Sequence, residues 1–193
     1  DLEVYRVEGH KWIGGSSRLP RGDVFMANIP TEELFTMPHR AKVNGTLEAT
    51  KPLSLQGKLV DGFSFVFEEG KVVSYEAEQG KELLEQLFSM DEGAMRLGEV
   101  AIVPDDSPIS NTGVLFYNTL FDENASCHFA FGNAYGENMP GTGDLSEEEK
   151  KERGMNHSMI HVDFMVGGPE LEIIGVKKDG TEVPLLKNGN WVE

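Results

Sequence analysis

Four separate segments of the sequence carry carboxylate and imidazole side chains in patterns that could hold a metal ion. The first is His161-Val162-Asp163, which lies between Ile160 and Phe164. On a β-strand, side chains two residues apart share a face, so His161 and Asp163 would lie together, opposite Val162. An imidazole and a carboxylate are good ligands for a divalent metal, but the same pair also forms ordinary hydrogen bonds on a solvated surface. This segment alone leaves both interpretations open.

The second segment is FDENASCHF at 121–129, in which Glu123 precedes His128 by five residues. Turn-forming residues separate two apolar runs here, so a carboxylate at the turn and an imidazole in the next run could converge on one ion. The neighbours of His128 predict that it is buried, and a buried histidine is often a hydrogen-bonded core residue instead. A nucleophile made of Cys127 and His128 is disfavoured, because adjacent strand residues face opposite sides and no neighbour is expected to lower the thiol pKa.

The third and fourth segments contribute glutamates. Glu99 opens an apolar strand predicted at 100–103, where it would enter a cavity mouth or simply mark an exposed strand start. Glu32 and Glu33 follow Pro30, and two acidic residues in the first turn of a helix would also suit the helix macrodipole.

Together the four segments form a carboxylate-rich set with two imidazoles. Such a set suits paired divalent ions such as Zn²⁺, Co²⁺ or Mn²⁺, which bridging carboxylates hold about 3.5–4 Å apart. The sequence has no HExxH, CxxC, Walker or G-x-S-x-G motif, which disfavours single-zinc proteases, zinc fingers, P-loop NTPases and serine hydrolases. The candidate ligands are Glu32 or Glu33, Glu99, Glu123, His128, His161 and Asp163.

Short strands must position most of these residues. The Asp-Gly pair near 178–181 and the Gly at the centre of 67–72 predict two hairpins. Helices are predicted at 80–90, from apolar residues at helical spacing, and at 146–153, from a Ser-x-x-Glu capping box. We therefore expect one β-rich α+β domain with a few short helices over residues 1–193. Further strands are predicted at 63–67, 71–75, 100–103, 159–164 and 171–176.

Composition narrows the possible partners and the compartment. The 193 residues carry a net charge of −16, which disfavours nucleic acid and anionic membrane surfaces as partners. Most acidic surface is only solvated, although acidity also suits a metal site. A single cysteine excludes an intramolecular disulfide and fits a reducing cytoplasm, and no apolar run approaches a membrane span or a signal peptide. The chain opens on Asp1 rather than Met, so we expect it to be trimmed or cut from a longer protein.

Several blocks of this sequence, among them the four that hold the candidate ligands, resemble the M29 metallopeptidases, the thermophilic family of aminopeptidases T, S and PepS. The resemblance runs from about Trp12 to the end of the chain, and FYNTLFDENASCH and HVDF are its most specific blocks. The matching blocks are NIPTEE at 28–33, VNGT at 43–46, TKPL at 50–53, LGEVA at 97–101, SPIS at 107–110, FYNTLFDENASCH at 116–128, HVDF at 161–164 and KNGNW at 187–191.

The resemblance implies a domain, a site and a reaction. The chain would be the C-terminal metal-binding half of the enzyme, without its N-terminal α/β domain. It would hydrolyse the N-terminal peptide bond of peptides through a metal-activated water, as a homodimer. Tyr135 would be the catalytic tyrosine, and the glutamate of the 32–33 pair that is not a ligand is a candidate general base. The implied ligands of two metal ions are Glu33, Glu99, Glu123, His128, His161 and Asp163.

Two other classes of function remain open from the sequence. A half-length chain could be a non-catalytic binding or assembly domain that a metal stabilises. A calcium-stabilised structural domain is a further alternative, but the central imidazoles disfavour Ca²⁺, which prefers oxygen ligands.

Overall fold

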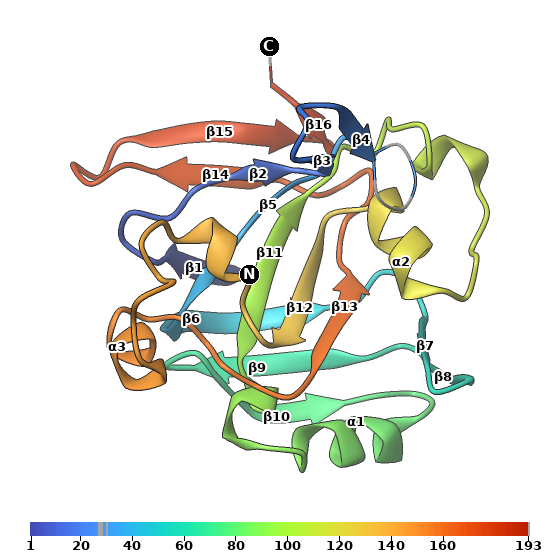
Figure 1. Ribbon diagram of the computed structural model, residues 1–193. Coiled ribbons are helices and arrows are strands. Elements are labelled where there is room, and N and C mark those ends of the chain that lie inside the picture. The colour runs from blue at the N-terminus through green and yellow to red at the C-terminus, as the bar shows by residue number, and fades with distance from the viewer. Residues whose placement is uncertain (27–28, 30, 193) are drawn as a thin grey trace.

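A computed structural model describes residues 1–26, 29 and 31–192 (Figure 1). Asn28 and Pro30, part of a block that resembles the M29 family, lie outside the described residues. The described residues form short strands and three α-helices, so the expected β-rich fold is confirmed. The helices are α1 (Lys81–Phe88), α2 (Thr119–Asp122) and α3 (Glu147–Glu152). The strands are β1 (Leu2–Arg6), β2 (Ile13–Gly14), β3 (Ser16–Arg18), β4 (Val24–Met26), β5 (Leu34–Thr36), β6 (Pro38–Glu48), β7 (Leu53–Leu55), β8 (Lys58–Val60), β9 (Ser64–Glu68), β10 (Lys71–Glu76), β11 (Leu97–Ile102), β12 (His128–Gly132), β13 (His161–Met165), β14 (Ile173–Val176), β15 (Glu182–Lys187) and β16 (Asn190–Trp191).

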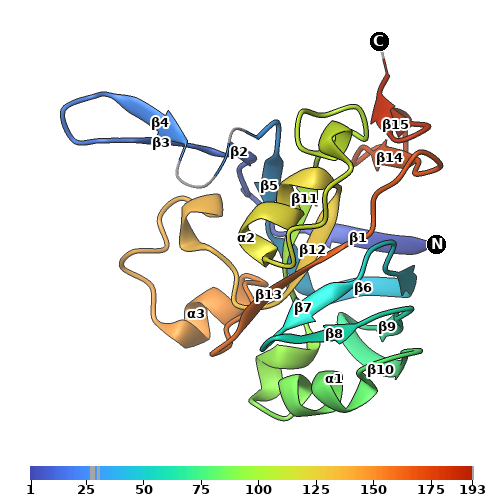
Figure 2. The ribbon, with the colours of Figure 1, turned by 90° about the vertical axis from the view of Figure 1, so that its right-hand side faces the viewer.

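Two antiparallel sheets make the body of the molecule. One has the strand order β1-β6-β9-β10, and the other has the order β13-β12-β11-β5-β2. Smaller sheets lie around them: β14-β15-β16 near the C-terminus and the hairpins β3-β4 and β7-β8 (Figures 1 and 2). Helix α1 packs beside the four-stranded sheet, and α3 lies on the side from which the β3-β4 hairpin projects.

Phenylalanine rings fill the space between the two large sheets. Phe65 and Phe67 alternate with exposed residues along β9, so both point to the core. The Phe65 ring centroid lies 4.8 Å from that of Phe131 on β12 and 5.3 Å from that of Phe164 on β13. Phe131 and Phe164 stack on each other at 4.8 Å. Because aromatic pairs of this kind hold one geometry, strands β12 and β13 offer a firm base for side chains on their opposite face.

The predicted hairpins and helices are present. Strands β9 and β10 pair with each other, and the turn between them contains Gly70, whose φ is +75°. Strands β14 and β15 also pair with each other, and their turn contains Gly180, whose φ is +83°. Helix α1 lies inside the predicted range 80–90. Helix α3 carries the predicted capping box, with the Ser146 hydroxyl accepting from Glu149 N–H.

Some predicted boundaries are wrong. Strand β13 begins at His161 rather than at 159, because the Asp91 carboxylate accepts a hydrogen bond from the backbone N–H of Met159 and holds this segment in a turn. Strand β11 begins at Leu97, which pairs with Phe131, so Glu99 lies within the strand rather than at its start. Strand β14 begins at 173 rather than 171.

The interpretation of Glu32 and Glu33 as the first turn of a helix is wrong. Residues 31–33 are irregular, and strand β5 starts directly after them at Leu34. The helix macrodipole therefore does not explain the two carboxylates. Among the described residues, no helix is both long enough and apolar enough to span a membrane.

Candidate metal centre

Strand pairing brings two of the candidate residues, Glu99 and Asp163, into one row across three strands. Glu99 on β11 pairs with Ala130 on β12, and Ala130 pairs with Asp163 on β13. Ala130 thus lies between the two carboxylate residues in the register, and its side chain is a single methyl group. His128 lies two residues before Ala130 and shares its face of the sheet, while Phe129 faces the core. All five residues of β12 are buried.

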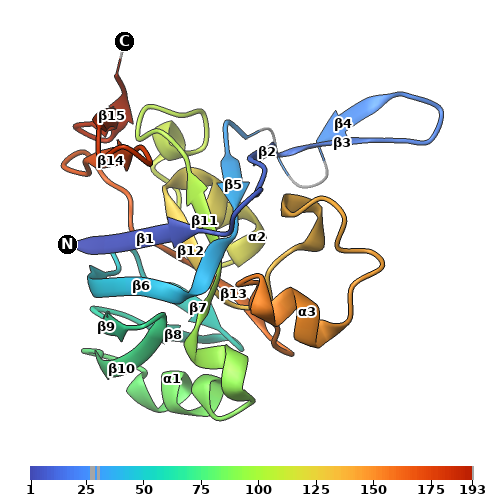
Figure 3. The same cartoon turned by 90° about the vertical axis from the view of Figure 1, so that its left-hand side faces the viewer.

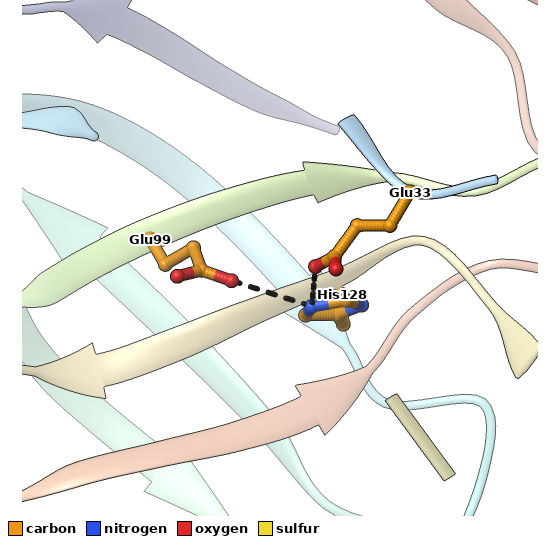
Figure 4. Close-up of side chains that lie close together, drawn as sticks. All are labelled: Glu33, Glu99 and His128. Carbon is orange, nitrogen blue, oxygen red and sulfur yellow. Dashed lines mark ion pairs between the residues drawn. The ribbon is translucent and has the colours of Figure 1, made fainter. Parts of the chain in front are cut away.

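The first group of side chains is Glu33, Glu99 and His128 (Figure 4). The His128 Nε2 atom lies 3.0 Å from Glu33 Oε1 and 3.4 Å from Glu99 Oε1. Its Nδ1 atom lies 3.0 Å from the backbone carbonyl of Ser126. Because a carbonyl only accepts hydrogen bonds, Nδ1 carries a proton and Nε2 faces the carboxylates. Glu33 is the residue just before β5, and β5 pairs with β11.

The second group is Glu99, His161 and Asp163. His161 Nε2 lies 3.4 Å from Asp163 Oδ1 and 3.7 Å from Glu99 Oε2. Its Nδ1 atom donates to the carbonyl of Asn133 at 2.8 Å, so this imidazole is oriented in the same way as His128. Glu99 therefore belongs to both groups, with one carboxylate oxygen toward each histidine.

Glu123 and Tyr135 lie at the edge of this arrangement. Glu123 follows α2 in a short 3₁₀ turn, where the sequence predicted a turn, and its carboxyl group contacts Asp163. The ring of Tyr135 lies 4.5 Å from the ring of His161, tilted by 42°, and is 41% exposed. Tyr135 thus contacts a candidate ligand and is partly open to solvent. Glu32 is exposed, whereas the Glu33 carboxylate is directed at His128.

Charge is concentrated strongly enough to shift several pKa values. Burial disfavours the charged form of Glu123, and Asp163 adds a repulsive charge, which together raise the Glu123 pKa to about 8. Burial opposes the charge on His161, but contact with Asp163 and the charge of Glu99 outweigh it and raise the His161 pKa to about 9. The pKa of His128 is also raised, against its own burial, by Glu33 and Glu99.

The pKa values of Glu99 and Tyr135 are raised for related reasons. Burial raises the pKa of Glu99, and the charge of Asp163 adds to the rise. Burial likewise raises the pKa of Tyr135, and the nearby carboxylates add to the rise, so the phenol keeps its proton at neutral pH. The metal-free site thus holds buried positive and negative charges, whose desolvation is unfavourable for folding unless further interactions compensate for it.

The donor set fits divalent metal ions. His128 Nε2 is fully buried and has no hydrogen-bond partner of suitable geometry among the described residues, although two carboxylates lie within 3.4 Å. Both imidazoles keep Nδ1 on a backbone carbonyl and present Nε2 to carboxylates, which is the usual orientation of ligating histidines. A mixture of imidazole and carboxylate donors suits Zn²⁺, Co²⁺ and Mn²⁺.

The sequence did not reveal the groups that orient these side chains. The carbonyls of Ser126 and Asn133 fix the two imidazoles, and every residue has such a carbonyl, so no sequence signal marks them. Asp122 was also missed as a supporting residue. Its carboxylate accepts from the backbone N–H groups of Phe116 and Asn118, at 2.7 and 2.9 Å, and so fixes the segment that leads to Glu123.

Comparison with known proteins gives the family. The sequence model of the thermophilic metalloproteases (M29) matches residues 1–191, so the chain belongs to this family of metalloproteases. It is 53% identical over 188 residues to aminopeptidase 2 of Geobacillus stearothermophilus, covering 97% of this chain and 46% of that protein. It is 51% identical over 192 residues to aminopeptidase T of Thermus aquaticus, covering 100% of this chain and 47% of the relative. The chain therefore spans about half the length of the curated relatives it matches.

Solved structures agree on the fold. Wild-type AmpT from Thermus thermophilus superposes with a TM-score of 0.93 at 49% identity, covering all of this chain and 47% of that one. A 2,5-dihydroxypyridine dioxygenase from Pseudomonas putida KT2440 superposes with a TM-score of 0.53 over 84% of this chain and 44% of its own, at 15% identity. At that identity the second likeness concerns the fold alone.

Proposed function

We propose that this chain is the C-terminal metal-binding half of a metal-dependent aminopeptidase, which cleaves the N-terminal peptide bond of peptides at a dinuclear site. The observation that carries the proposal is the placement of Glu99, whose two carboxylate oxygens face two different histidines. A carboxylate shared in this way suits two ions about 3.5–4 Å apart. The proposed metals are Zn²⁺, Co²⁺ or Mn²⁺. The proposed ligands are Glu33, Glu99, Glu123, His128, His161 and Asp163.

The side chains at the site have separate parts in such a reaction. Bound divalent ions supply a water that ionises near neutral pH and a Lewis acid for a carbonyl group. Tyr135 is the proposed donor to the oxyanion that would form at the scissile carbonyl, which its retained phenolic proton and its position against His161 support. The excess of carboxylates over imidazoles attracts a protonated amine, and this favours the free end of a peptide over its interior.

The proposal extends to the rest of the enzyme. An N-terminal α/β domain, outside this chain, completes it, as the half-length match to the relatives supports. Peptides with a free N-terminus are the proposed substrates, and a homodimer is the proposed assembly. A cytoplasmic location is also proposed, in line with the single, buried, free Cys127.

Hydrolysis of blocked and free substrates tests this function. The intact protein that carries this chain, stripped by chelator and reloaded with Zn²⁺, Co²⁺ or Mn²⁺, should release the chromophore from aminoacyl p-nitroanilides but not from their N-acetylated forms. Metal analysis should give two ions per chain. Binding of metal with no hydrolysis of any free-amine substrate would replace the proposal by a metal-stabilised binding domain.

A further inference from the structure

Strand β11 has one irregular position, at Gly98. The strand lies between β5 and β12 in the five-stranded sheet (Figure 3). Leu97 pairs with Phe131 of β12, but the next pair along the ladder is Glu99 with Ala130. Two steps along β11 therefore match one step along β12, and Gly98 is the extra residue of a β-bulge.

The bulge decides which face of the sheet Glu99 occupies. In a regular strand, residues two apart share a face. Leu97 is buried in the core with Phe131, so without the extra residue Glu99 would also point into the core. With the bulge, the Glu99 carboxylate instead faces the histidines of the candidate centre, as Figure 4 shows for His128. Val100 packs against the core again, as the ordinary alternation after Glu99 requires.

The missing side chain of Gly98 leaves room for two backbone carbonyls. A Cβ atom at this position would collide with the carbonyl oxygens of Gly132 and Asn133. The Asn133 carbonyl accepts the hydrogen bond from His161 Nδ1 at 2.8 Å. The Gly132 carbonyl accepts from Nδ2 of the fully buried Asn156 at 2.7 Å. A side chain at position 98 would therefore displace carbonyls that already have buried partners.

The segment that carries these carbonyls is also held from its other side. The Asn133 N–H donates to the Ile160 carbonyl at 2.7 Å. Gly132 has a φ of +96°, and a side chain there would collide with the same Ile160 carbonyl. Because the segment is bonded on both sides, it cannot retreat from a methyl group at position 98 without moving the carbonyl away from His161 Nδ1.

We propose that Gly98 is a positioning residue of the centre, which acts on two ligands from different strands. Its bulge directs Glu99 to the face of the sheet that carries the candidate ligands, and its lack of a side chain lets the Asn133 carbonyl hold the His161 ring. The proposal rests on the proposed function, because it concerns ligands of that metal centre. A single methyl group at position 98 should therefore disturb both ligands.

Gly98→Ala in the intact protein tests this role, with Gly80→Ala as the matched control. A Cβ atom at position 80 would also collide with a backbone carbonyl, that of Leu59, and the φ of +77° adds strain. The nearest atoms to that position belong to Leu59 and Val60 rather than to a candidate ligand. Both variants should be less stable than wild type. The Zn²⁺ dissociation constant, measured against a competing chelator, should rise about 10–100-fold in Gly98→Ala and stay unchanged in Gly80→Ala.

The ring of His161 gives a second measurement that needs no metal. In the metal-free protein with isotope-labelled histidine, the wild type should show a slowly exchanging Nδ1 proton on His161 in NMR spectra, assigned by its loss in His161→Gln. Gly98→Ala should lose this protection, and Gly80→Ala should keep it. A general loss of stability affects both variants, so a difference between them reports the contact of the Asn133 carbonyl with the ring.

The outcomes separate the role of Gly98 from the proposed function. Wild-type metal affinity in Gly98→Ala, or an equal loss in Gly80→Ala, overturns the positioning role alone. Should Gly98→Ala fail to fold, the wild-type spectrum decides, because a His161 Nδ1 proton that exchanges freely with water overturns the role, and a protected one supports it. A wild type that binds no divalent ion overturns the proposed function itself, and no result from the two glycine variants resembles that outcome.

Discussion

Replacing Glu99 by glutamine is the sharpest test of the proposed centre, because one atom changes and the volume barely does. Glu99 is 5% exposed and directs one oxygen toward His128 and the other toward His161. Glutamine removes the negative charge and offers only one acceptor oxygen. The remaining amide oxygen still accepts a hydrogen bond and the side-chain volume is nearly the same, so the folded structure should tolerate the change.

The expected magnitude follows from what a shared ligand supplies. Removing a group that only orients a metal ligand already lowers metal affinity by about 10–100-fold. Loss of the negative charge of a shared ligand should therefore lower metal affinity by at least about 100-fold. At fixed metal concentration this lowers the metal-dependent stabilisation by about 2.7 kcal/mol. For a chain of this size, 1 kcal/mol shifts the melting temperature by about 2–4 °C, so the metal-induced shift should shrink by about 5–10 °C.

The assay compares melting temperatures with and without saturating Zn²⁺ or Co²⁺, together with peptide hydrolysis. Glu85→Gln on the exposed side of α1 is the matched control and should behave as wild type. In Glu99→Gln the metal-free melting temperature should stay the same or rise, since burial of the Glu99 charge is unfavourable. Wild-type hydrolysis and an undiminished metal-induced shift in this variant would refute the shared-ligand argument.

Four further outcomes are expected. Tyr135→Phe should lower kcat by about 10²–10³-fold while two metal ions remain bound, and a parallel loss of metal would show that the phenol has a structural part instead. Metal affinity should rise with pH up to about 9, because His161 must release a proton whose pKa is about 9 before it binds metal. Titrations with buffered Zn²⁺ at several pH values should therefore give a dissociation constant that falls as the pH increases. In the metal-free protein the raised pKa values of Glu123 and His161 stabilise the fold at low pH, so unfolding free energies should fall as pH increases from about 4.5 to 9. Finally, the 193-residue chain alone should bind metal yet hydrolyse peptides weakly, and the complete protein should restore activity; equal kcat/KM values for the two would show that this chain by itself excludes the middle of a polypeptide.

Local patterns predicted the elements but not their boundaries. The apolar spacing of α1 and the capping box of α3 involve residues within one or two turns of each other, so the sequence contains the whole signal. The start of β13 depends on Asp91, which is 68 residues away from Met159 and holds its N–H. No window of neighbouring residues carries that information.

Local patterns likewise predicted part of the candidate site, and the rest depends on contacts between distant segments. Alternation on one strand was enough to place His161 and Asp163 on a common face. That Glu33 would reach His128 depends on the pairing of β5 with β11 and of β11 with β12, three segments far apart in the sequence. The family resemblance, rather than any spacing rule, chose Glu33 over Glu32, whereas Glu123 was already a candidate from its position five residues before His128. Its selection of Glu33 coincides with the carboxylate that lies 3.0 Å from the imidazole.

The charges of the candidate centre imply that metal binding would stabilise the fold as well as supply chemistry. Glu99 and Asp163 flank Ala130 in the register, and both carboxylates are more than nine-tenths buried. Two buried negative charges side by side are unfavourable for folding, and the two imidazoles take up protons to offset them. Divalent ions would replace those protons with larger charge at the same position. The aromatic stack of Phe65, Phe131 and Phe164 beneath the strands keeps the carboxylates from moving apart. A rigid base under repelling ligands therefore makes the free energy of metal binding part of the free energy of folding, and the metal-free protein should be the less stable form wherever the metal displaces the proton of His161.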